Sequence, residues 1–483
     1  MPQANEFKTE SLRVTRGRCE VFRGWPGLLV LTVAVGLTGC ASEHGSAGTK
    51  TAPIKAPNTA PIITGAISPS ATASLAPRRV SINGMSLAEA VGVAISRHPD
   101  ISRANAIVAQ STSEVAIAEA AWYPTIEYGV QPGFGGSFGS DGNSTGVRAS
   151  LGVNQLVYDF GRTSSRISAA DAVLGKQRHL LNDTVEGVAY NTASTFVELA
   201  ASQDVIAAAE RQALALGETR AKIDERVEAG LSDASDLNQA DVAIQRAKAE
   251  ALKARTRFDV AAGKLAELTG VRPERVAKLS GTSDFVGRLG SGGGDIEHTP
   301  AVLAASAAME AANAKVKLAE AERLPSIGVG VSRSMSTGRT NANDSTWLGV
   351  SLRGNYSLGG LAKHQIAAAE AERLAAAQAL ENQRMVTRTA LNSAETEASG
   401  AAARLASYDE VLTLSRSSRD LYWQEYTLDK RPLTEVINAE REIYLSQVER
   451  TNAVADGVLA GIKAYTAVGR FVALLKIAEG RRK

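Results

Sequence analysis

A heptad pattern over residues 226–270 constrains this chain more than any other feature. Two rows of apolar side chains run in parallel along it, each recurring every seven residues. The first row is Leu237, Ile244, Ala251, Phe258 and Leu265, and the second is Ala240, Ala247, Ala254, Ala261 and Leu268. Two such rows predict a helix that packs in a left-handed coiled coil. Because the second row is mostly alanine, we expect the partner helix to approach closely.

The same pattern returns later in the chain, which indicates an internal duplication. Residues 236–240 (DLNQA) correspond to residues 435–439 (EVINA), an offset of 435 − 236 = 199. Two prolines repeat as well, since Pro99 and Pro300 differ by 300 − 99 = 201, as do Pro124 and Pro325 (325 − 124 = 201). The small row recurs as Ala439, Ser446, Ala453, Ala460 and Ala467.

Each repeat carries the same order of expected elements. In the first repeat, Ser86 and Glu89 form a capping box that begins a short helix ending near residue 97. The expected elements after it are a helix over 100–122, strands over 125–138 and 147–158, a long helix to 229 and a return helix to 270. In the second repeat they are strands over 327–337 and 345–358, a long helix over 361–428 and a return helix to 470. The strands alternate apolar and polar residues, as strands of a membrane barrel do.

We therefore predict a mainly helical α+β fold made of two repeats, each with short helices, a β-hairpin and a long coiled-coil helical hairpin. Four strands alone would leave unpaired edges in a bilayer, so they must close a barrel with other chains. Three copies would form a twelve-stranded outer-membrane barrel on an α-helical periplasmic tunnel.

The N-terminal region has the pattern of a secretory signal. Basic residues precede an apolar run over 27–37, which is too short to cross a bilayer. The run ends in Leu37-Thr38-Gly39-Cys40, which resembles a bacterial lipobox and would make Cys40 the lipidated first residue of the mature protein. The alternative is an ordinary signal followed by an unused thiol. Residues 41–80 are rich in Ala, Ser, Thr, Pro and Gly, which favours a flexible tether.

The patterns divide the chain into six expected regions. They are a lipoprotein-type signal peptide (1–39), the lipidated Cys40 with a tether (40–82), a first repeat (83–280), a Gly-rich linker (281–297), a second repeat (298–471) and a basic tail (472–483).

Several other kinds of function find no support in the sequence. The formal net charge is +2, which shows no bias toward nucleic acid. The five histidines never cluster, so no metal site is expected. The glycine run at 290–294 lacks the Lys-Ser or Lys-Thr of a phosphate loop. We expect no catalytic residues and no cofactor.

Three segments carry a resemblance to the TolC-like outer membrane efflux proteins. They are residues 158–162 (YDFGR), 229–240 (AGLSDASDLNQA) and 430–439 (KRPLTEVINA), within a match over about 87–471. The resemblance implies a homotrimeric channel-tunnel in the outer membrane of a Gram-negative bacterium, extending into the periplasm. It also implies a periplasmic adaptor, an inner-membrane ABC or RND transporter as the energy source, and no enzymatic chemistry.

By the same resemblance, the turns of the long hairpins form a periplasmic gate. Asp236 lies where an acid accepts contacts from the facing helix pair, and Tyr426 and Arg431 lie where the donors are found. Glu435 matches an acidic ring that favours cations. Asn438 stands where some members carry a second acid. The resemblance therefore does not decide whether two acidic rings block cations in this chain. The alternative for all five residues is a solvated helix surface near a turn.

Two questions stay open at this point. The cargo is either small toxic compounds or a secreted protein such as an adhesin, since the YDFGR segment resembles the protein-secretion branch and the lipobox resembles drug-efflux members. The alternative function is a coiled-coil lipoprotein that acts as a structural spacer without a pore. The alternating strands discriminate between the two functions, because a spacer needs none.

Overall fold

The computed structural model describes residues 84–135, 144–280, 295–338 and 343–475. All of them belong to one compact unit, Ala76–Lys483. The helices are α1 (Leu87–Arg97), α2 (Pro99–Glu119), α3 (Arg162–Glu228), α4 (Ala234–Thr269), α6 (Pro300–Glu322), α7 (Leu361–Thr427), α8 (Leu433–Ala467) and α9 (Phe471–Leu474), with 3-10 turns η1 (Ala120–Trp122) and η2 (Ile296–His298). The strands are β1 (Thr125–Gly135), β2 (Ser144–Tyr158), β3 (Ser326–Gly338) and β4 (Asn343–Arg353). The expected signal peptide, Cys40 and the tether lie outside the described residues.

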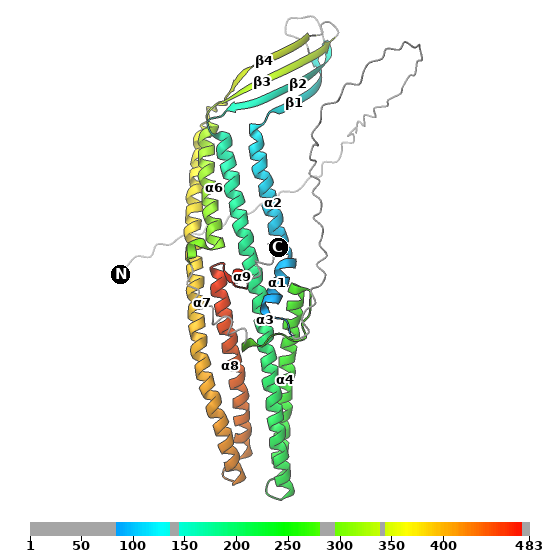
Figure 1. Cartoon of the computed structure of the whole chain (residues 1–483), viewed down its shortest axis with the longest axis vertical. Coiled ribbons are helices and arrows are strands. Elements are labelled where there is room, and N and C mark those ends of the chain that lie inside the picture. The colour runs from blue at the N-terminus through cyan, green and yellow to red at the C-terminus, as the bar shows by residue number, and fades with distance from the viewer. Residues whose placement is uncertain (1–83, 136–143, 281–294, 339–342, 476–483) are drawn as a thin grey trace, which may run out of the picture. The chain divides into compact units, whose positions relative to one another are not determined.

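The duplication seen in the sequence is present in the fold. Helices α3 and α7 each have 67 residues, and at 1.5 Å per residue each is roughly 100 Å long. Each is followed by a return helix, which gives two helical hairpins, α3–α4 and α7–α8. The hairpins run side by side, and the strands lie at the end away from the hairpin turns (Figure 1). None of the described helices is apolar over a stretch long enough to cross a membrane.

Helix starts follow the local signals. Ser86 accepts a hydrogen bond from the Glu89 amide while the Glu89 side chain accepts from Ser86, so the predicted capping box is confirmed. At α3, the buried Asp159 carboxylate accepts hydrogen bonds from the Gly161 and Thr163 amides, 3.2 and 2.7 Å away. The YDFGR segment thus fastens the sheet to the long helix, since a side-chain oxygen satisfies amides that a helix start leaves unpaired.

The four strands form one antiparallel sheet in the order β1-β2-β3-β4. β4 ends at Arg353, earlier than the predicted end at 358. The apolar face of the sheet carries exposed large side chains: Ile126, Tyr128, Val130, Val147, Leu151, Val329, Val331, Leu348, Val350 and Leu352. The opposite, polar face carries Glu127, Ser150, Asn154, Ser332, Ser334 and Trp347, among others. This is the two-sided pattern of strands between lipid and water.

Helix α4 packs against α3 through its row of small side chains. Ala240, Ala247, Ala254 and Ala261 are at most 3% exposed, whereas the larger first row is half-buried except for Leu265. α3 therefore approaches α4 closely along the alanines, as predicted.

The main core lies where α1, α2, α3, α4, α8 and α9 meet. Phe196, Leu199, Leu265, Ile462 and Phe471 are almost fully buried there. α9 was not predicted; it follows Gly469, whose φ of +67° ends the return helix before residue 470. The core therefore includes Val472 and Leu475, which the predicted basic tail was expected to contain.

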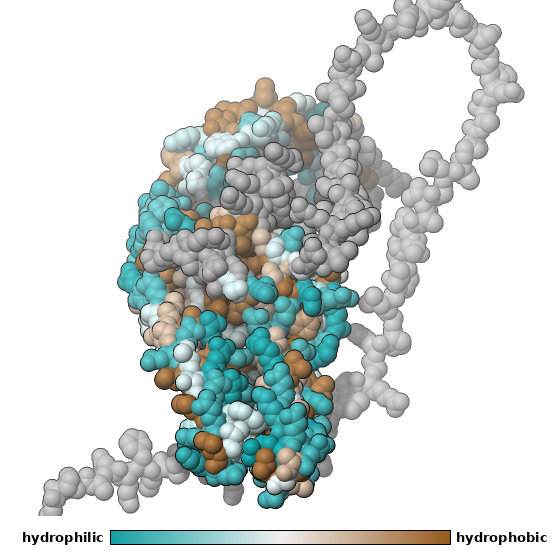
Figure 2. Space-filling view, turned by 60° about the horizontal axis from the view of Figure 1, so that its bottom comes forward, coloured by the Kyte–Doolittle hydropathy of each residue, from teal (hydrophilic) through white to brown (hydrophobic). Residues whose placement is uncertain are grey.

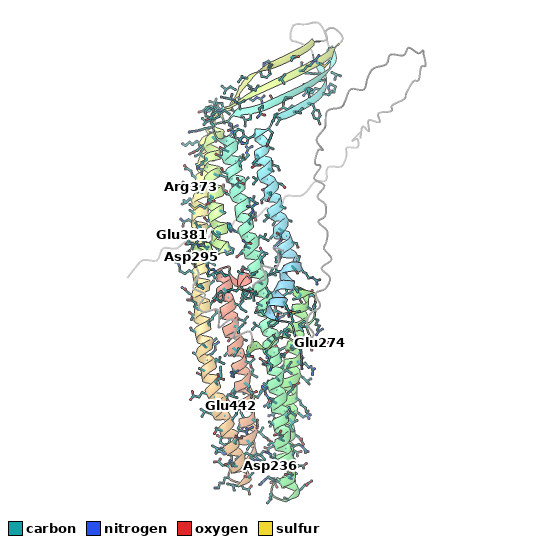
Figure 3. The ribbon with its side chains drawn as sticks, in the orientation of Figure 1. Asp236, Glu274, Asp295, Arg373, Glu381 and Glu442 are labelled. Atoms are coloured by element: carbon teal, nitrogen blue, oxygen red, sulfur yellow. The ribbon has the colours of Figure 1, made fainter. Side chains whose placement is uncertain are left out.

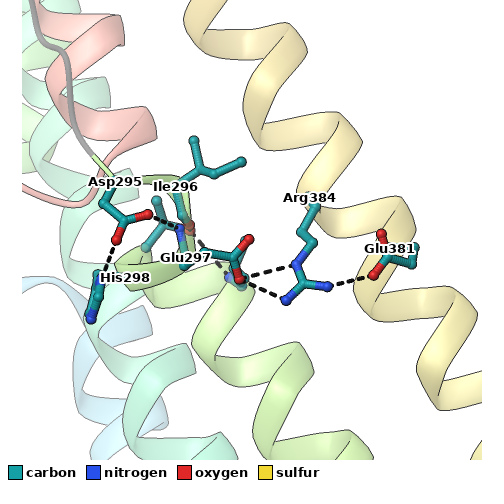
Figure 4. Close-up of polar contacts among 8 residues, drawn as sticks. Asp295, Ile296, Glu297, His298, Glu381 and Arg384 are labelled. Carbon is teal, nitrogen blue, oxygen red and sulfur yellow. Dashed lines mark hydrogen bonds and ion pairs between the residues drawn. The ribbon is translucent and has the colours of Figure 1, made fainter.

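A polar junction marks the start of the second repeat (Figure 4). The Asp295 carboxylate accepts hydrogen bonds from the Glu297 amide at 3.0 Å and pairs with His298 at 2.8 Å. These hydrogen bonds lower the pKa of Asp295. Arg384 of α7 binds Glu297 at 2.7 Å and Glu381 at 2.5 Å, so the chain entering α6 is tied to α7.

Candidate functional site

The predicted site residues lie at the end of the molecule opposite the sheet, where the two helical hairpins turn. Figure 3 places Asp236 there, in the first turn of α4. Hydrophilic residues dominate these hairpin ends in the view of Figure 2. Each turn contains a left-handed residue, Gly230 (φ +71°) and Asp429 (φ +55°), which lets the chain reverse within a few residues.

Tyr426 of α7 joins the two hairpins. Its hydroxyl donates to the Asp236 carboxylate at 2.9 Å and lies 3.1 Å from the Ser232 hydroxyl. Since the single phenolic proton is used by Asp236, Ser232 acts as the donor to Tyr426. The Tyr426 side chain is buried, and this burial raises its pKa. The predicted contact between Asp236 and Tyr426 is therefore present within one chain.

Arg226, near the end of α3, completes this arrangement. Its Nε donates to Ser232 at 3.2 Å, and its guanidinium lies 3.5 Å from the Asp429 carboxylate and 5.4 Å from the centre of the Tyr426 ring. Hydrogen bonds therefore run from the Arg226 cation through Ser232 and Tyr426 to the Asp236 anion. Hydrogen bonds in such a chain polarise and strengthen one another. We call Arg226, Ser232, Asp236, Tyr426 and Asp429 the tip cluster.

Arg431 does not reach Asp236 within one chain. It binds Glu425 at 2.5 Å and forms an ion pair with Glu435, both on its own hairpin, and it stacks 4.0 Å from the centre of the Tyr422 ring. Here Arg431 stiffens the α7–α8 turn rather than joining the hairpins. Glu435 thus pairs with a positive charge, and Asn438 lines a groove of about 510 Å³ between α3, α4 and α8.

Buried apolar side chains of α3 and α8 pack beneath the tip cluster. Ile223, Leu433 and Val436 are at most 2% exposed beneath it. Trp423 packs against Tyr426 with 5.6 Å between ring centres, and the Lys222 ammonium lies 5.2 Å from the Trp423 ring. A cation over an indole face is attracted by the ring, so two cation–aromatic contacts, Arg226 on Tyr426 and Lys222 on Trp423, link α3 to α7.

Sequence reasoning did not single out Arg226, Ser232 or Asp429. The duplication contained a signal for two of them. At the offset of 199, Arg226 corresponds to Glu425 (425 − 226) and Ser232 to Arg431 (431 − 232). The Arg226–Ser232 contact therefore repeats as the Glu425–Arg431 contact, with the positive charge moved from one partner to the other.

The described part of the chain contains no group of three or more His, Cys, Asp or Glu placed to hold a metal ion. The tip cluster can hold the two helical hairpins together through polar contacts that are partly exposed to solvent.

Comparisons with known proteins agree with this architecture. A family model described as "Outer membrane efflux protein" matches residues 90–271 and 296–470. The outer membrane efflux protein BepC of Brucella suis biovar 1 (strain 1330) is 23% identical over 364 residues, which cover 74% of this chain and 80% of that protein. Protein CyaE of Bordetella pertussis is 23% identical over 335 residues, 65% of this chain and 69% of that protein.

Solved structures show the same fold. The outer-membrane channel OprN superimposes with a TM-score of 0.68 at 18% identity, covering 79% of this chain and 89% of that chain. The outer membrane protein VceC from Vibrio cholerae superimposes with a TM-score of 0.67 at 16% identity, covering 79% of this chain and 96% of that chain.

Proposed function

This chain belongs to the outer membrane efflux protein family, and from that premise we propose that three copies form a gated duct for export across the outer membrane. The family and the fold are those of outer-membrane channel proteins, so the spacer alternative is not favoured. The observation that carries the proposal is the two-faced sheet, whose exposed large apolar side chains lie mostly on one side. Such a sheet suits a barrel wall between lipid and water.

The sheet supports closure by further copies because its edges are open. β1 and β4 are the outer strands, and an unpaired strand edge is not tolerated in lipid. Pairing β4 of one copy with β1 of the next satisfies both edges. Three copies then give a barrel of twelve strands.

The helices support the same assembly through the duplication. α6 packs against both α3 and α7, whereas its counterpart α2 packs against α3 alone among the long helices. α2 exposes Ile117 at 72%, and α7 exposes Leu374 at 62%. Repeating the α6 arrangement places α7 of a neighbouring copy against α2 and covers these side chains.

The tip cluster supports a gate at the periplasmic end. Opening the tunnel there requires the two hairpins to separate, and the contacts of Arg226 and Tyr426 resist that separation. Each polar contact is weak where solvent reaches it, but three related clusters act together. Glu435 and Asn438 would line the narrow end, and the Arg431–Glu435 pair would limit the cation preference of that end.

We propose a periplasmic adaptor and an inner-membrane ABC or RND transporter as partners, because the resemblance to outer membrane efflux proteins implies them. The proposed cargo is either small toxic compounds or a secreted protein. Lipidation of Cys40 also stays a prediction, to be checked by acyl labelling of the wild type against Cys40→Ser.

The test is single-channel conductance of the purified protein in a planar bilayer, with its mass measured in parallel. We expect discrete steps from a trimer. Combining Tyr426→Phe with Arg226→Ser removes the Tyr426–Asp236 hydrogen bond and the Arg226–Asp429 ion pair, and should raise the conductance several-fold, whereas Arg431→Ser alone should raise it less.

Two results would count against the proposal. Wild type that stays monomeric and silent would exclude the duct. A conducting trimer whose steps are unchanged in the double variant would retain the duct and exclude the tip cluster as its gate.

A further inference from the structure

Among the described residues, one exposed large apolar side chain lies on the otherwise polar face of the sheet, where Leu156 of β2 is half-buried. Trp347 of β4 pairs with Ser332 of β3, and its neighbours on both sides along β4, Leu348 and Thr346, belong to the opposite face. The other residues near it on this face are small or polar, including Ser334, Ser345 and Ser351. Because sheet faces alternate strictly along a strand, Trp347 does not share the surface of the lipid-facing side chains.

The Trp347 ring rests on a floor of two glycines. A Cβ on Gly349 would lie 2.7 Å from Cζ2 of the indole, and a Cβ on Gly330 would lie 3.4 Å from its Cζ3. These two glycines pair with each other across β3 and β4. The indole therefore lies flat over bare backbone, in a place that any larger residue at 349 would deny it.

The rest of the ring is open. Trp347 is 47% exposed, while Gly330 beneath it is buried. Asn154 reaches the same place from β2, since a Cβ on Gly330 would lie 2.5 Å from its Oδ1. One aromatic surface is thus exposed on the polar face of the sheet, near the Asn154 amide and opposite Ser332 of β3.

We propose that Trp347 is a binding platform for planar aromatic groups of the cargo inside the barrel. The inference deepens the proposed function and rests on it, because only a closed barrel turns the polar face into a lumen. Stacking needs a flat, accessible and rigidly held ring. The glycine floor holds the indole, and the small residues around it leave its outer surface free for a second ring.

The position of the ring is tested by fluorescence in vesicles. The variant Trp25→Phe/Trp122→Phe/Trp423→Phe leaves Trp347 as the sole tryptophan of the four in the chain. We expect quenching by aqueous iodide and none by lipids with brominated tails. The matched control adds Trp347→Phe and Leu348→Trp, which moves the indole to the apolar face and should reverse both results. Quenching of Trp347 by the brominated lipids would overturn the proposal.

Binding is tested with proflavine, a planar aromatic cation, on the detergent-solubilised protein by fluorescence anisotropy. Trp347→Ala should weaken binding about tenfold, in the range of aromatic stacking, and Trp347→Phe should restore part of it. Gly349→Ala should also weaken it, because the added Cβ displaces the ring. Leu348→Ala, on the opposite face, should leave the affinity unchanged, and the non-aromatic cation tetraethylammonium should not compete.

The two hypotheses fail separately. A conducting trimer that binds proflavine equally well with and without Trp347 overturns the platform and keeps the duct. A monomeric, silent protein that still binds proflavine through Trp347 would exclude the duct, and with it a platform inside a barrel, and would leave only an aromatic site on the sheet.

Discussion

At the scale of single residues, buried charge decides how this protein responds to pH. Glu186 of α3 is 6% exposed, and its carboxylate accepts a hydrogen bond from the Val472 amide at 3.3 Å. Burial raises the pKa of Glu186 from 4.5 to about 7, although the Val472 and Phe471 amides oppose the shift and the Asp183 carboxylate adds to it. The folded protein thus binds this proton more tightly than the unfolded chain does.

The protonated form of Glu186 stabilises the fold, so stability should fall as the pH rises from about 4.5 through about 7, by on the order of 3 kcal/mol. Glu186→Gln keeps the acceptor for Val472 but cannot ionise, so its unfolding temperature should change less over this range. Parallel thermal melts of both proteins from pH 5 to pH 8 measure the difference. Identical pH profiles would exclude Glu186 as the source.

At the scale of elements, close packing along alanines joins α3 to α4. Ala254 is 3% exposed in the middle of the small row. Ala254→Leu inserts extra methylenes where the helices approach closely, so we expect a loss of about 1–3 kcal/mol in the free energy of unfolding. Its neighbour Arg255 is exposed, and Arg255→Leu serves as the control with little effect. Denaturant unfolding followed by circular dichroism measures both, and equal midpoints would contradict the packing argument.

At the scale of the whole molecule, the duplication predicts a contact between copies. A Cβ on Gly175 of α3 would lie 3.9 Å from Cβ of Ala307 on α6. The offsets within the repeats are 361 − 162 = 199 for the long helices and 300 − 99 = 201 for the short ones. The equivalent residues in the other repeat are therefore Leu374 of α7 (175 + 199) and Ala106 of α2 (307 − 201). Both residues are exposed in the single chain.

Ala106→Cys combined with Leu374→Cys should form disulfides between copies and give a trimer on a non-reducing gel, since a Cβ separation near 4 Å suits a disulfide. Gly175→Cys combined with Ala307→Cys is the matched control and should crosslink within one chain, leaving the mass of a monomer. Should Ala106 and Leu374 fail to link while the control links, the proposed arrangement of copies would be wrong.

Local sequence patterns determined most of the elements. The heptad rows, the capping box at Ser86 and the repeated prolines predicted the helices, and the alternation predicted both hairpins, because these signals act between residues close in the chain. They failed where distant residues decide. α9 forms because Phe471 and Val472 pack into a core made by five other helices, and β4 ends where no partner strand continues its ladder.

Part of the candidate site could likewise be predicted from the sequence, and part depends on the tertiary structure. The family resemblance predicted that Asp236 accepts a contact from Tyr426, whereas the contact of Arg226 with Asp429 depends on how the two hairpins lie side by side. Arg431 turned to its own hairpin because Glu425 and Glu435 lie within its reach there. The sequence by itself determined the repeated elements and their apolar faces, since periodicity is local. Only the tertiary structure decided which side chains meet between hairpins, because those contacts join residues about 200 positions apart.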